Sequence, residues 1–268
     1  MVRAAGKEPG GTQSIERALS LLDAFTEEHP ERRVSELVQL TGLGQSTVSR
    51  LVGALEALGF LAHDARSGLY RIGRRTISLS SLALNQSAVF RQSRQVAQNL
   101  AAEFGLGTNV AERVDDRLFY LCHFEGRQAP RNFTMVGRGG PLHATGLGKA
   151  LLSDSDPDEV VELLGKTLPG FTPKTLTRSA DLLKALEEVR SRGYATEIEE
   201  LAFGRACVAA PIRDQTSRVV AAISVSGPLS AIDLGRRQDE LGTLVIEHAD
   251  QISTALGYNS VSLGAARV

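Results

Sequence analysis

The sequence predicts an α+β protein of two domains: an N-terminal winged helix-turn-helix, a linker helix and a C-terminal α+β domain. Three observations lead to this prediction. Residues 42–75 carry a helical apolar stripe, then a glycine, then two short strand-like runs around a polar turn. Residues 76–104 contain neither glycine nor proline and have helical character. Beyond them, strand and helix patterns are mixed without a βαβ repeat, and 268 residues suit about two domains.

The first domain is expected to begin with two helices. Thr12 is suited to cap the first helix, and Ser35 to cap a short second helix that carries Leu37 and Leu40. Residues 41–44, TGLG, then supply a tight turn. The apolar face of the first helix is predicted to consist of Ile15, Ala18, Leu19, Leu22 and Phe25.

The third helix has one apolar face and one small, polar face. Small residues let a helix lie close to base-pair edges, where hydroxyls and a guanidinium can bond bases or phosphates. Gly59 is expected to end the helix. The predicted buried stripe is Val48, Leu51, Val52, Leu55 and Leu58, and the opposite face is Ser46, Ser49, Arg50, Gly53 and Ala57.

A β-hairpin is expected next, with strands Phe60–His63 and Leu69–Ile72 around residues 64–68. Residues 43–75 hold five arginines against two acidic residues, whereas the whole chain has a net charge of −1. A basic patch of this kind is typical of a nucleic-acid interface, although a helical bundle used only for packing or dimerisation is the alternative. The predicted DNA contacts are Gln45, Ser46, Thr47, Ser49, Arg50, Arg66 and Arg71.

The second domain is predicted to contain a sheet with helices against it. A hairpin is expected around Asp115 and Asp116, and residues 141–152 begin as a loop and become a helix. The predicted strands are Asn109–Val114, Leu118–Phe124, Arg131–Val136, Cys207–Ile212 and Val219–Val225. The other predicted helices are Asp156–Gly165, Ser179–Arg192 and Leu234–Leu256.

Composition excludes several classes of protein. Hydrophobic residues make up 42% of the chain, and no apolar stretch is long enough to span a membrane. Residues 1–11 lack an apolar signal core and are expected to form a disordered leader. Two cysteines suggest no disulfide framework, and five scattered histidines show no zinc spacing. We therefore expect a cytoplasmic protein without metal or cofactor.

The segment TGLGKA at 145–150 superficially suggests a phosphate-binding loop. It lacks the required glycine, because His143 occupies that position, and Ala150 follows the lysine in place of Ser or Thr. If a helix begins near Thr145, the amides of Gly146 and Leu147 can bind a carboxylate. The alternative is a glycine turn that only permits close packing.

Four further positions could form a site. Ser224 and Ser226 share one face of a strand, and they either line a polar pocket or bond neighbouring backbone. Cys207 begins an apolar strand, where a cysteine is more often inert than nucleophilic, although His143 is a candidate partner. Glu197 belongs to an acidic run of the kind that usually forms a solvated face.

The chain resembles the IclR type of bacterial transcriptional regulators. The matching segments are SIERALSLLDAF, SELVQLTGLGQSTVSRLVGALEALGF, SGLYRIG, PLHATGLGKALL, RGYATEIEE, CVAAPIRD and VVAAISVSGP. The resemblance implies a GAF/PAS-like C-terminal domain, a homodimer or dimer of dimers, and an effector held between the glycine segment and the sheet. The effector-binding positions that it implies are Gly146, Leu147, Glu197, Cys207, Ser224 and Ser226.

Two of these positions depart from the family. Leu147 would narrow the site, and Glu197 stands where a shorter Asp occurs in relatives that bind small oxoacids. A very small acid is therefore not expected. The predicted effector is a small organic molecule with a carboxylate or similar polar head.

The combined prediction is a cytoplasmic transcriptional regulator, a repressor or an activator and not an enzyme, whose binding to double-stranded operator DNA responds to this effector. The alternatives are a constitutive DNA-binding oligomer without effector and a small-molecule enzyme that uses Cys207 and His143. The predicted boundaries are a leader at 1–11, the DNA-binding domain at 12–75, the linker helix at 76–89 and the effector-binding and oligomerisation domain at 90–260.

Overall fold

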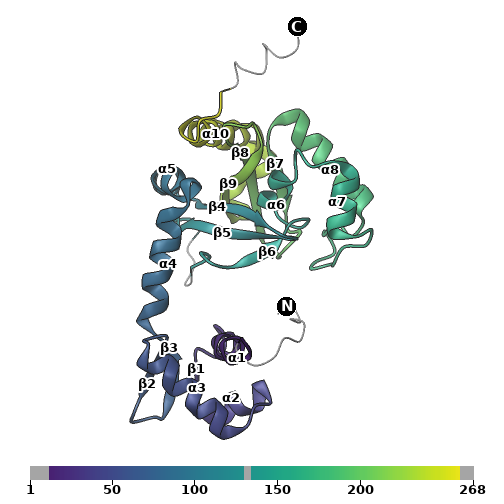
Figure 1. Cartoon of the computed structure of the whole chain (residues 1–268). Coiled ribbons are helices and arrows are strands. Elements are labelled where there is room, and N and C mark those ends of the chain that lie inside the picture. The colour runs from purple at the N-terminus through teal and green to yellow at the C-terminus, as the bar shows by residue number, and fades with distance from the viewer. Residues whose placement is uncertain (1–11, 130–133, 260–268) are drawn as a thin grey trace. The chain divides into compact units, whose positions relative to one another are not determined.

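The computed structural model describes residues 12–129 and 134–259 and divides the chain into two compact units, Met1–Ala83 and Leu84–Val268 (Figure 1). The predicted leader lies outside the described residues. The predicted domain boundaries near residues 75 and 90 stay predictions. No helix among the described residues is long and apolar enough to cross a membrane.

The first unit is a winged helix-turn-helix, as predicted. The predicted hairpin is present, and a short strand that the sequence pattern did not indicate joins it, so the sheet order is β1-β3-β2. The elements are α1 (Gln13–Leu22), β1 (Glu31–Arg32), α2 (Val34–Thr41), α3 (Gln45–Ala57), β2 (Leu61–Asp64), β3 (Leu69–Ile72) and α4 (Arg74–Gln86). The last of these, α4, begins in this unit and ends three residues beyond Ala83, and it buries no residue along its length.

The apolar stripe of α3 is confirmed for four of its five predicted members, and Leu58 is the exception. Leu58 is 65% exposed because α3 ends at Ala57 and Gly59 takes a left-handed conformation with φ +78°. The amide of Phe60 donates to the carbonyl of Leu55 at 2.8 Å, which turns the chain sharply at this point. The core of the unit consists of Leu21, Leu37, Val48, Leu51, Val52, Leu55 and Leu61.

The predicted face of α1 was partly wrong. Ile15 and Leu19 are 61% and 54% exposed, and the fully buried residue is Leu21, with Ala18 and Leu22 partly buried beside it. The residues Ala18, Leu21, Leu22 and Phe25 also have helical spacing, so periodicity alone did not distinguish the two stripes. Packing against α3 and α2 selects the second one.

The predicted caps were also partly wrong. Thr12 lies at the N-cap of α1, but its side chain makes no capping hydrogen bond. Ser35 is already inside α2, which begins one residue earlier, and the carboxylate of Glu36 accepts a hydrogen bond from the Arg33 amide at 2.7 Å. Leu40 is exposed, because the side of this short helix that packs on the core carries Leu37, which is buried, and Val34 and Val38, which are partly buried.

The second unit contains one antiparallel six-stranded sheet in the order β6-β5-β4-β9-β8-β7. Its strands are β4 (Gly107–Val114), β5 (Arg117–Phe124), β6 (Gly139–Pro141), β7 (Ala195–Ile198), β8 (Arg205–Arg213) and β9 (Val219–Pro228). Its helices are α5 (Ala88–Phe104), α6 (Gly146–Leu151), α7 (Pro157–Leu164), α8 (Ser179–Arg192), α9 (Leu229–Ile232) and α10 (Leu234–Ala255).

The strand predicted at 131–136 was wrong where the structure can test it. Residues 130–133 lie outside the described residues, and residues 134–136 are not in a strand. The third strand is instead β6, which follows a turn at Gly137 with φ +85° and pairs with the start of β5. Strand β7 was not predicted, because four residues are too short to show a clear alternation.

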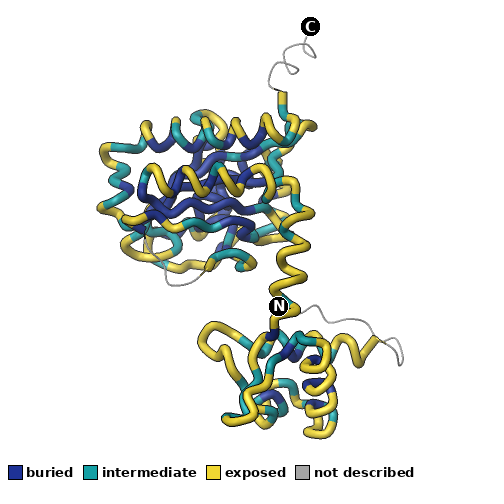
Figure 2. The backbone as a smooth tube through the Cα atoms, turned by 90° about the vertical axis from the view of Figure 1, so that its left-hand side faces the viewer, coloured by how far each residue is buried: buried dark blue, intermediate teal, exposed yellow. Residues whose placement is uncertain are grey.

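The sheet lies between two helical layers. Helices α5 and α10 cover one face, and α6, α7 and α8 cover the other (Figure 1). The strands of this sheet are largely buried (Figure 2). Ile223 and Val225 of β9 pack on the α5–α10 side, whereas Ala222 packs on the α6 side. The strand alternation therefore places Ser224 and Ser226 beneath α6.

Candidate functional site

Strand register brings polar residues from five strands together beneath α6. These residues lie in two neighbouring rows across the sheet, and they are distant in the sequence. One row is Glu197, Cys207, Ser226 and Gly107, and the next row contains Ser224, Asn109 and His123. Residues at one register position on one face lie close enough to contact one another.

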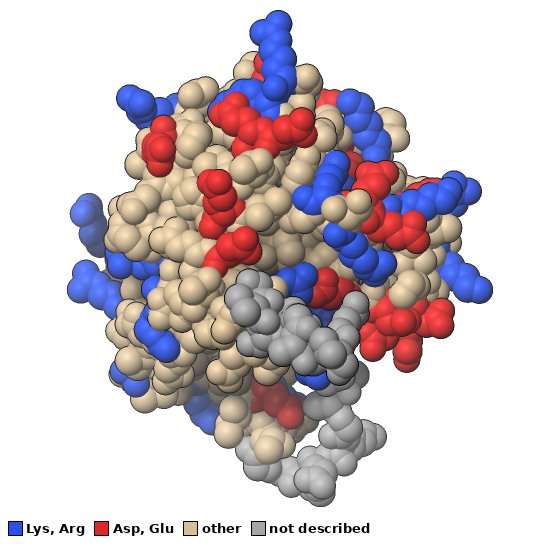
Figure 3. Space-filling view, turned by 90° about the horizontal axis from the view of Figure 1, so that it is seen from above, with Lys and Arg blue, Asp and Glu red and all other residues tan. Residues whose placement is uncertain are grey.

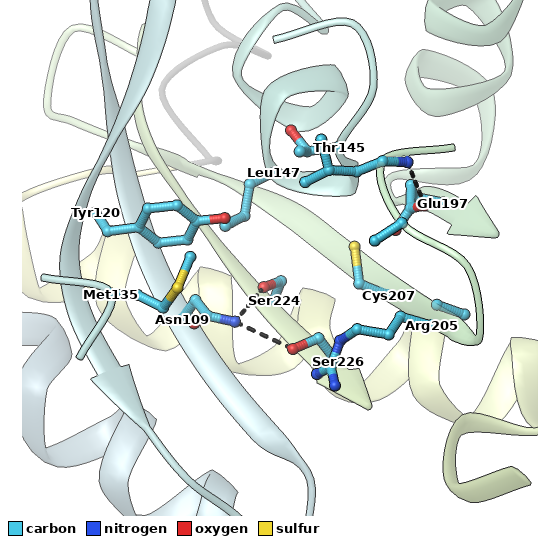
Figure 4. Close-up of a pocket in the computed structure, with 13 residues that line it drawn as sticks. Asn109, Tyr120, Met135, Thr145, Leu147, Glu197, Arg205, Cys207, Ser224 and Ser226 are labelled. Atoms are coloured by element: carbon cyan, nitrogen blue, oxygen red, sulfur yellow. Dashed lines mark hydrogen bonds between the residues drawn. The ribbon is translucent and has the colours of Figure 1, made fainter. Parts of the chain in front are cut away.

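Five residues of these rows form the floor of a cavity of about 140 Å³: Glu197, Cys207, Ser224, Ser226 and Asn109 (Figure 4). Five of the six predicted effector-binding residues line it: Leu147, Glu197, Cys207, Ser224 and Ser226. Gly146 is not in the lining, because it packs on Cys207, where an added Cβ would lie 2.5 Å from Sγ. The Gly146 amide also bonds the Cys207 thiol, and its contact with an effector stays a prediction.

Sequence reasoning missed several residues that line the cavity. Asn109 is the one amide side chain of β4 and lies in the buried part of that strand, next to Val110, and an amide beside an aliphatic residue was the signal that could have identified it. Arg205 begins β8 and adds a guanidinium to the wall. The other missed lining residues are Tyr120, Met135, Thr145, Leu201, Ala202 and Ala206.

The Asn109 amide is the centre of a hydrogen-bond network. Its Nδ2 donates to Ser226 Oγ at 3.2 Å and to Ser224 Oγ at 3.4 Å (Figure 4). Its Oδ1 lies 2.8 Å from His123 Nδ1. Ser226 Oγ donates to the Gly107 carbonyl at 3.4 Å. A side-chain network, and not backbone alone, therefore satisfies the two serines.

Glu197 is buried, with 7% of its surface exposed, so it does not belong to a solvated face. Its Oε1 accepts hydrogen bonds from the Glu200 amide at 2.6 Å and the Leu201 amide at 3.3 Å. Burial raises the pKa of Glu197 above the ordinary glutamate value, although these amides oppose the shift. Nearby, the buried ammonium of Lys149 pairs with Glu200 Oε1 at 2.6 Å. Glu197 thus holds the loop that contributes Leu201 and Ala202 to the cavity wall.

The substitution Glu197→Gln is expected to stabilise the second unit at pH 8 and to have no effect near pH 4. When folding raises the pKa of a carboxyl, the folded state loses stability as the pH rises above the pKa of the unfolded state. The loss reaches its full size once the pH exceeds the pKa of the folded state. Below about pH 4 both states are protonated, so the two proteins should unfold alike. Glutamine keeps the accepting oxygen. Urea unfolding of both proteins at the two pH values checks this, and equal midpoints at pH 8 contradict it.

The positions of Cys207 and His143 do not support nucleophilic chemistry. Burial raises the pKa of the Cys207 thiol, which keeps it protonated and unreactive. His143 Nε2 lies 2.8 Å from the Pro169 carbonyl, and its ring stacks on Phe171. A thiolate–imidazole pair therefore does not form between these residues. Within the described ranges, no cluster of acidic, cysteine or histidine side chains could hold a metal ion.

The predicted DNA-contacting residues of α3 are largely accessible to solvent. Gln45, Ser46, Ser49 and Arg50 of α3 are exposed, and Thr47 is half-buried. The backbone of α3 before Gln45 turns at Gly44, which leaves the helix N-terminus without a side-chain cap. An uncapped N-terminus of this kind can approach a phosphate.

The two wing arginines are also solvent-facing. Arg66 is exposed in the turn between β2 and β3, where Asp64 Oδ1 accepts from its amide at 3.0 Å. Arg71 of β3 lies opposite Glu31, and their charged atoms are 4.0 Å apart. By contrast, the face of the second unit over α10 mixes acidic and basic side chains (Figure 3). That face is therefore not uniformly basic.

Family models match both units. The model of the IclR helix-turn-helix domain matches residues 14–65, and the model of the C-terminal domain of bacterial IclR transcriptional regulators matches residues 81–254. Among curated proteins, the transcriptional regulator XynR of Escherichia coli K12 is 31% identical over 250 residues, covering 92% of this chain and 98% of XynR. The repressor AllR of the same strain is 34% identical over 248 residues, covering 92% of this chain and 91% of AllR.

A solved structure is also similar. An IclR homologue from Microbacterium hydrocarbonoxydans, crystallised with 4-hydroxybenzoate, has a TM-score of 0.76 and 26% identity, with 91% of this chain and 98% of that chain covered. The winged helix and the sheet domain agree with these matches over both units. The chain belongs to the IclR family of bacterial transcriptional regulators.

Proposed function

We propose that this protein is a repressor whose winged helix binds operator DNA and whose cavity binds a small organic acid that changes operator affinity. The general part of this proposal follows from membership of the family: the chain is a transcriptional regulator with an effector-binding C-terminal domain, and not an enzyme. Its relative AllR is named a repressor. The observation that carries the proposal is the cavity beneath α6, where a polar floor meets apolar walls.

The lining of the cavity supports a carboxylate on an apolar body. Ser224 and Ser226 can bond a polar head, while Leu147, Met135 and Leu201 would cover the remainder. The guanidinium of Arg205 adds positive charge to the wall. The homologue crystallised with 4-hydroxybenzoate bound a molecule of this class.

Glu197 selects against a purely anionic ligand. Both of its hydrogen bonds within the described residues go to Oε1. A ligand hydroxyl or amide N–H facing Oε2 would be attracted, whereas a second carboxylate would be repelled. We therefore propose an effector with a carboxylate at one end and a hydrogen-bond donor at the other.

Operator binding is proposed to involve at least a homodimer. One chain carries one recognition helix, so a two-fold operator needs a second copy, in a dimer or a dimer of dimers. Effector binding would then shift the population between two spacings of the winged helices. DNA contacts are assigned to the seven predicted residues of α3 and the wing.

The proposal is tested in two steps. The wild-type protein first selects an operator duplex from fragmented genomic DNA. A thermal-shift screen of small organic acids then identifies ligands, because molecules that bind only the folded protein raise its melting temperature. Gel shifts with and without a hit measure the response. An operator affinity that no binding molecule changes would support the constitutive alternative.

The double substitution Ser224→Ala with Ser226→Ala is expected to weaken binding of the identified acid by about 1–3 kcal/mol. The change removes two hydroxyl contacts and leaves the Asn109 amide without acceptors. Operator affinity without effector should hardly change, because both residues are buried in the second unit. Calorimetry measures the loss. Wild-type affinity in the double variant would place the site elsewhere.

A further inference from the structure

In the hydrogen-bond network beneath α6, the donor and the acceptor of each bond can be assigned. One buried histidine outside the cavity lining, His123, determines this assignment. His123 lies on β5 opposite Asn109 on β4, and Ser224 lies opposite Asn109 on the other side. The three side chains thus form one row across β5, β4 and β9. The His123 side chain is 5% exposed, so its contacts are made inside the protein.

The orientation of the Asn109 amide follows from the one hydroxyl hydrogen of Ser226. That hydrogen is directed at the Gly107 carbonyl, so Ser226 Oγ must accept from Asn109. Only Nδ2 can donate, which turns Oδ1 toward His123. The reversed amide would require the same Ser226 hydrogen to serve two acceptors.

This orientation assigns the proton on His123. An amide oxygen only accepts, so Nδ1 of His123 must carry the hydrogen that bridges the 2.8 Å to Asn109 Oδ1. The other ring nitrogen, Nε2, lies 3.9 Å from the carboxylate of Glu125. Both the neutral ring protonated at Nδ1 and the doubly protonated ring meet the requirement. The neutral ring protonated only at Nε2 does not.

The orientation of the Asn109 amide determines how Ser224 can bond a ligand. Its Oγ accepts from Asn109 Nδ2 and makes no other hydrogen bond within the described residues. Its own hydroxyl hydrogen therefore remains for a molecule in the cavity, which Ser224 lines. A reversed Asn109 would take that hydrogen and leave Ser224 as an acceptor. The floor would then attract ligand donors in place of ligand acceptors.

We infer that His123 is a positioning residue for effector selectivity: it orients the Asn109 amide so that Ser224 donates to the effector and the cavity floor prefers a carboxylate to a carboxamide. This inference rests on the proposed function of the cavity. It goes beyond that proposal by assigning selectivity to a residue that does not line the site. It also predicts a protonation state that exists without any ligand.

The first test therefore uses the ligand-free protein. Histidines are labelled with 15N, and long-range 1H–15N correlation spectra distinguish the ring protonated at Nδ1 from the ring protonated only at Nε2. The signal of His123 is assigned by its loss in His123→Gln. A proton on Nδ1 is expected. A bare Nδ1 overturns the inference, whatever the cavity binds.

The second test measures selectivity with a matched pair of probes, 4-hydroxybenzoate and 4-hydroxybenzamide. Calorimetry gives both dissociation constants for wild type, His123→Phe and His123→Gln. Wild type should prefer the acid by about tenfold or more, because a hydrogen bond to a charged group is stronger than one to a neutral group. His123→Phe removes the donor and should reduce this preference at least about fivefold. His123→Gln retains a donor and should restore it.

A surface substitution controls for general effects on the second unit. Asn99 is exposed on α5 and accepts from Gln95, so Asn99→Asp should leave the preference unchanged. An unaltered acid preference in His123→Phe overturns the inference and leaves the proposed function standing. If wild type prefers the amide, the assigned polarity is wrong. If wild type binds neither probe, this class of effector fails, and the 15N spectra still decide the state of His123.

Discussion

Replacing Arg50 with alanine should reduce operator affinity by roughly tenfold to a hundredfold without affecting folding. Arg50 is exposed on α3, on the face opposite the buried residues Val48 and Leu55. A bidentate contact between an arginine and guanine is worth about 1–3 kcal/mol, and the loss would then be confined to one base position. A phosphate contact would instead weaken all sequences alike and make the salt dependence shallower.

The measurement is a fluorescence titration on a duplex that the wild-type protein has selected from a random library, at several salt concentrations. Arg236→Ala is the matched control, because Arg236 is an exposed arginine at the start of α10 in the other unit. Equal losses in both variants would indicate a general charge effect. Wild-type affinity in Arg50→Ala would remove α3 from the proposed interface.

Gly148→Ala should destabilise the second unit by about 3 kcal/mol or more, at the upper end of the usual cost of overpacking. A Cβ at this position would lie 2.1 Å from the carbonyl oxygen of Leu142 and 2.4 Å from its Cα. These are backbone atoms, so no side-chain rotation relieves the clash. The alanine would force α6 away from the chain that precedes it, and with α6 the cavity residues Thr145 and Leu147.

Gly53→Ala is the control for this change. Gly53 lies within α3, and an added Cβ meets no atom within 4 Å. The same substitution there should stabilise the first unit by about 0.5–1 kcal/mol through helix propensity. Differential scanning calorimetry of wild type and both variants measures the two effects. A wild-type melting profile for Gly148→Ala would contradict the close packing of α6 described above.

The sequence by itself determined the elements whose signals are local. The stripe Val48, Leu51, Val52 and Leu55 could be assigned from spacing alone, because a helix has one period and this segment has one apolar face. The glycine at 59 and the hairpin around 64–68 likewise follow from turn chemistry. The six effector-binding positions came from motifs of the family, and five of them line the cavity.

Other features depended on packing between elements. Ile15 and Leu21 both satisfy helical spacing in α1, and only the contact with α3 and α2 buries Leu21 and exposes Ile15. Leu58 continues the stripe in the sequence, yet the chain reverses before it can pack. In both cases periodicity describes a helix in isolation, whereas burial depends on its neighbours and on where it ends.

The polar network beneath α6 was decided by the tertiary structure alone. Asn109 meets Ser224 and Ser226 across more than a hundred residues of sequence, and His123 reaches Asn109 through the register of β5 against β4. Register is a property of paired strands, so no single segment encodes it. The position of Glu197 could not be predicted from the sequence for the same reason. An acidic run predicts a solvent-exposed surface, and only the pairing of β7 with β8 places this carboxylate opposite Cys207 in the lining of the cavity.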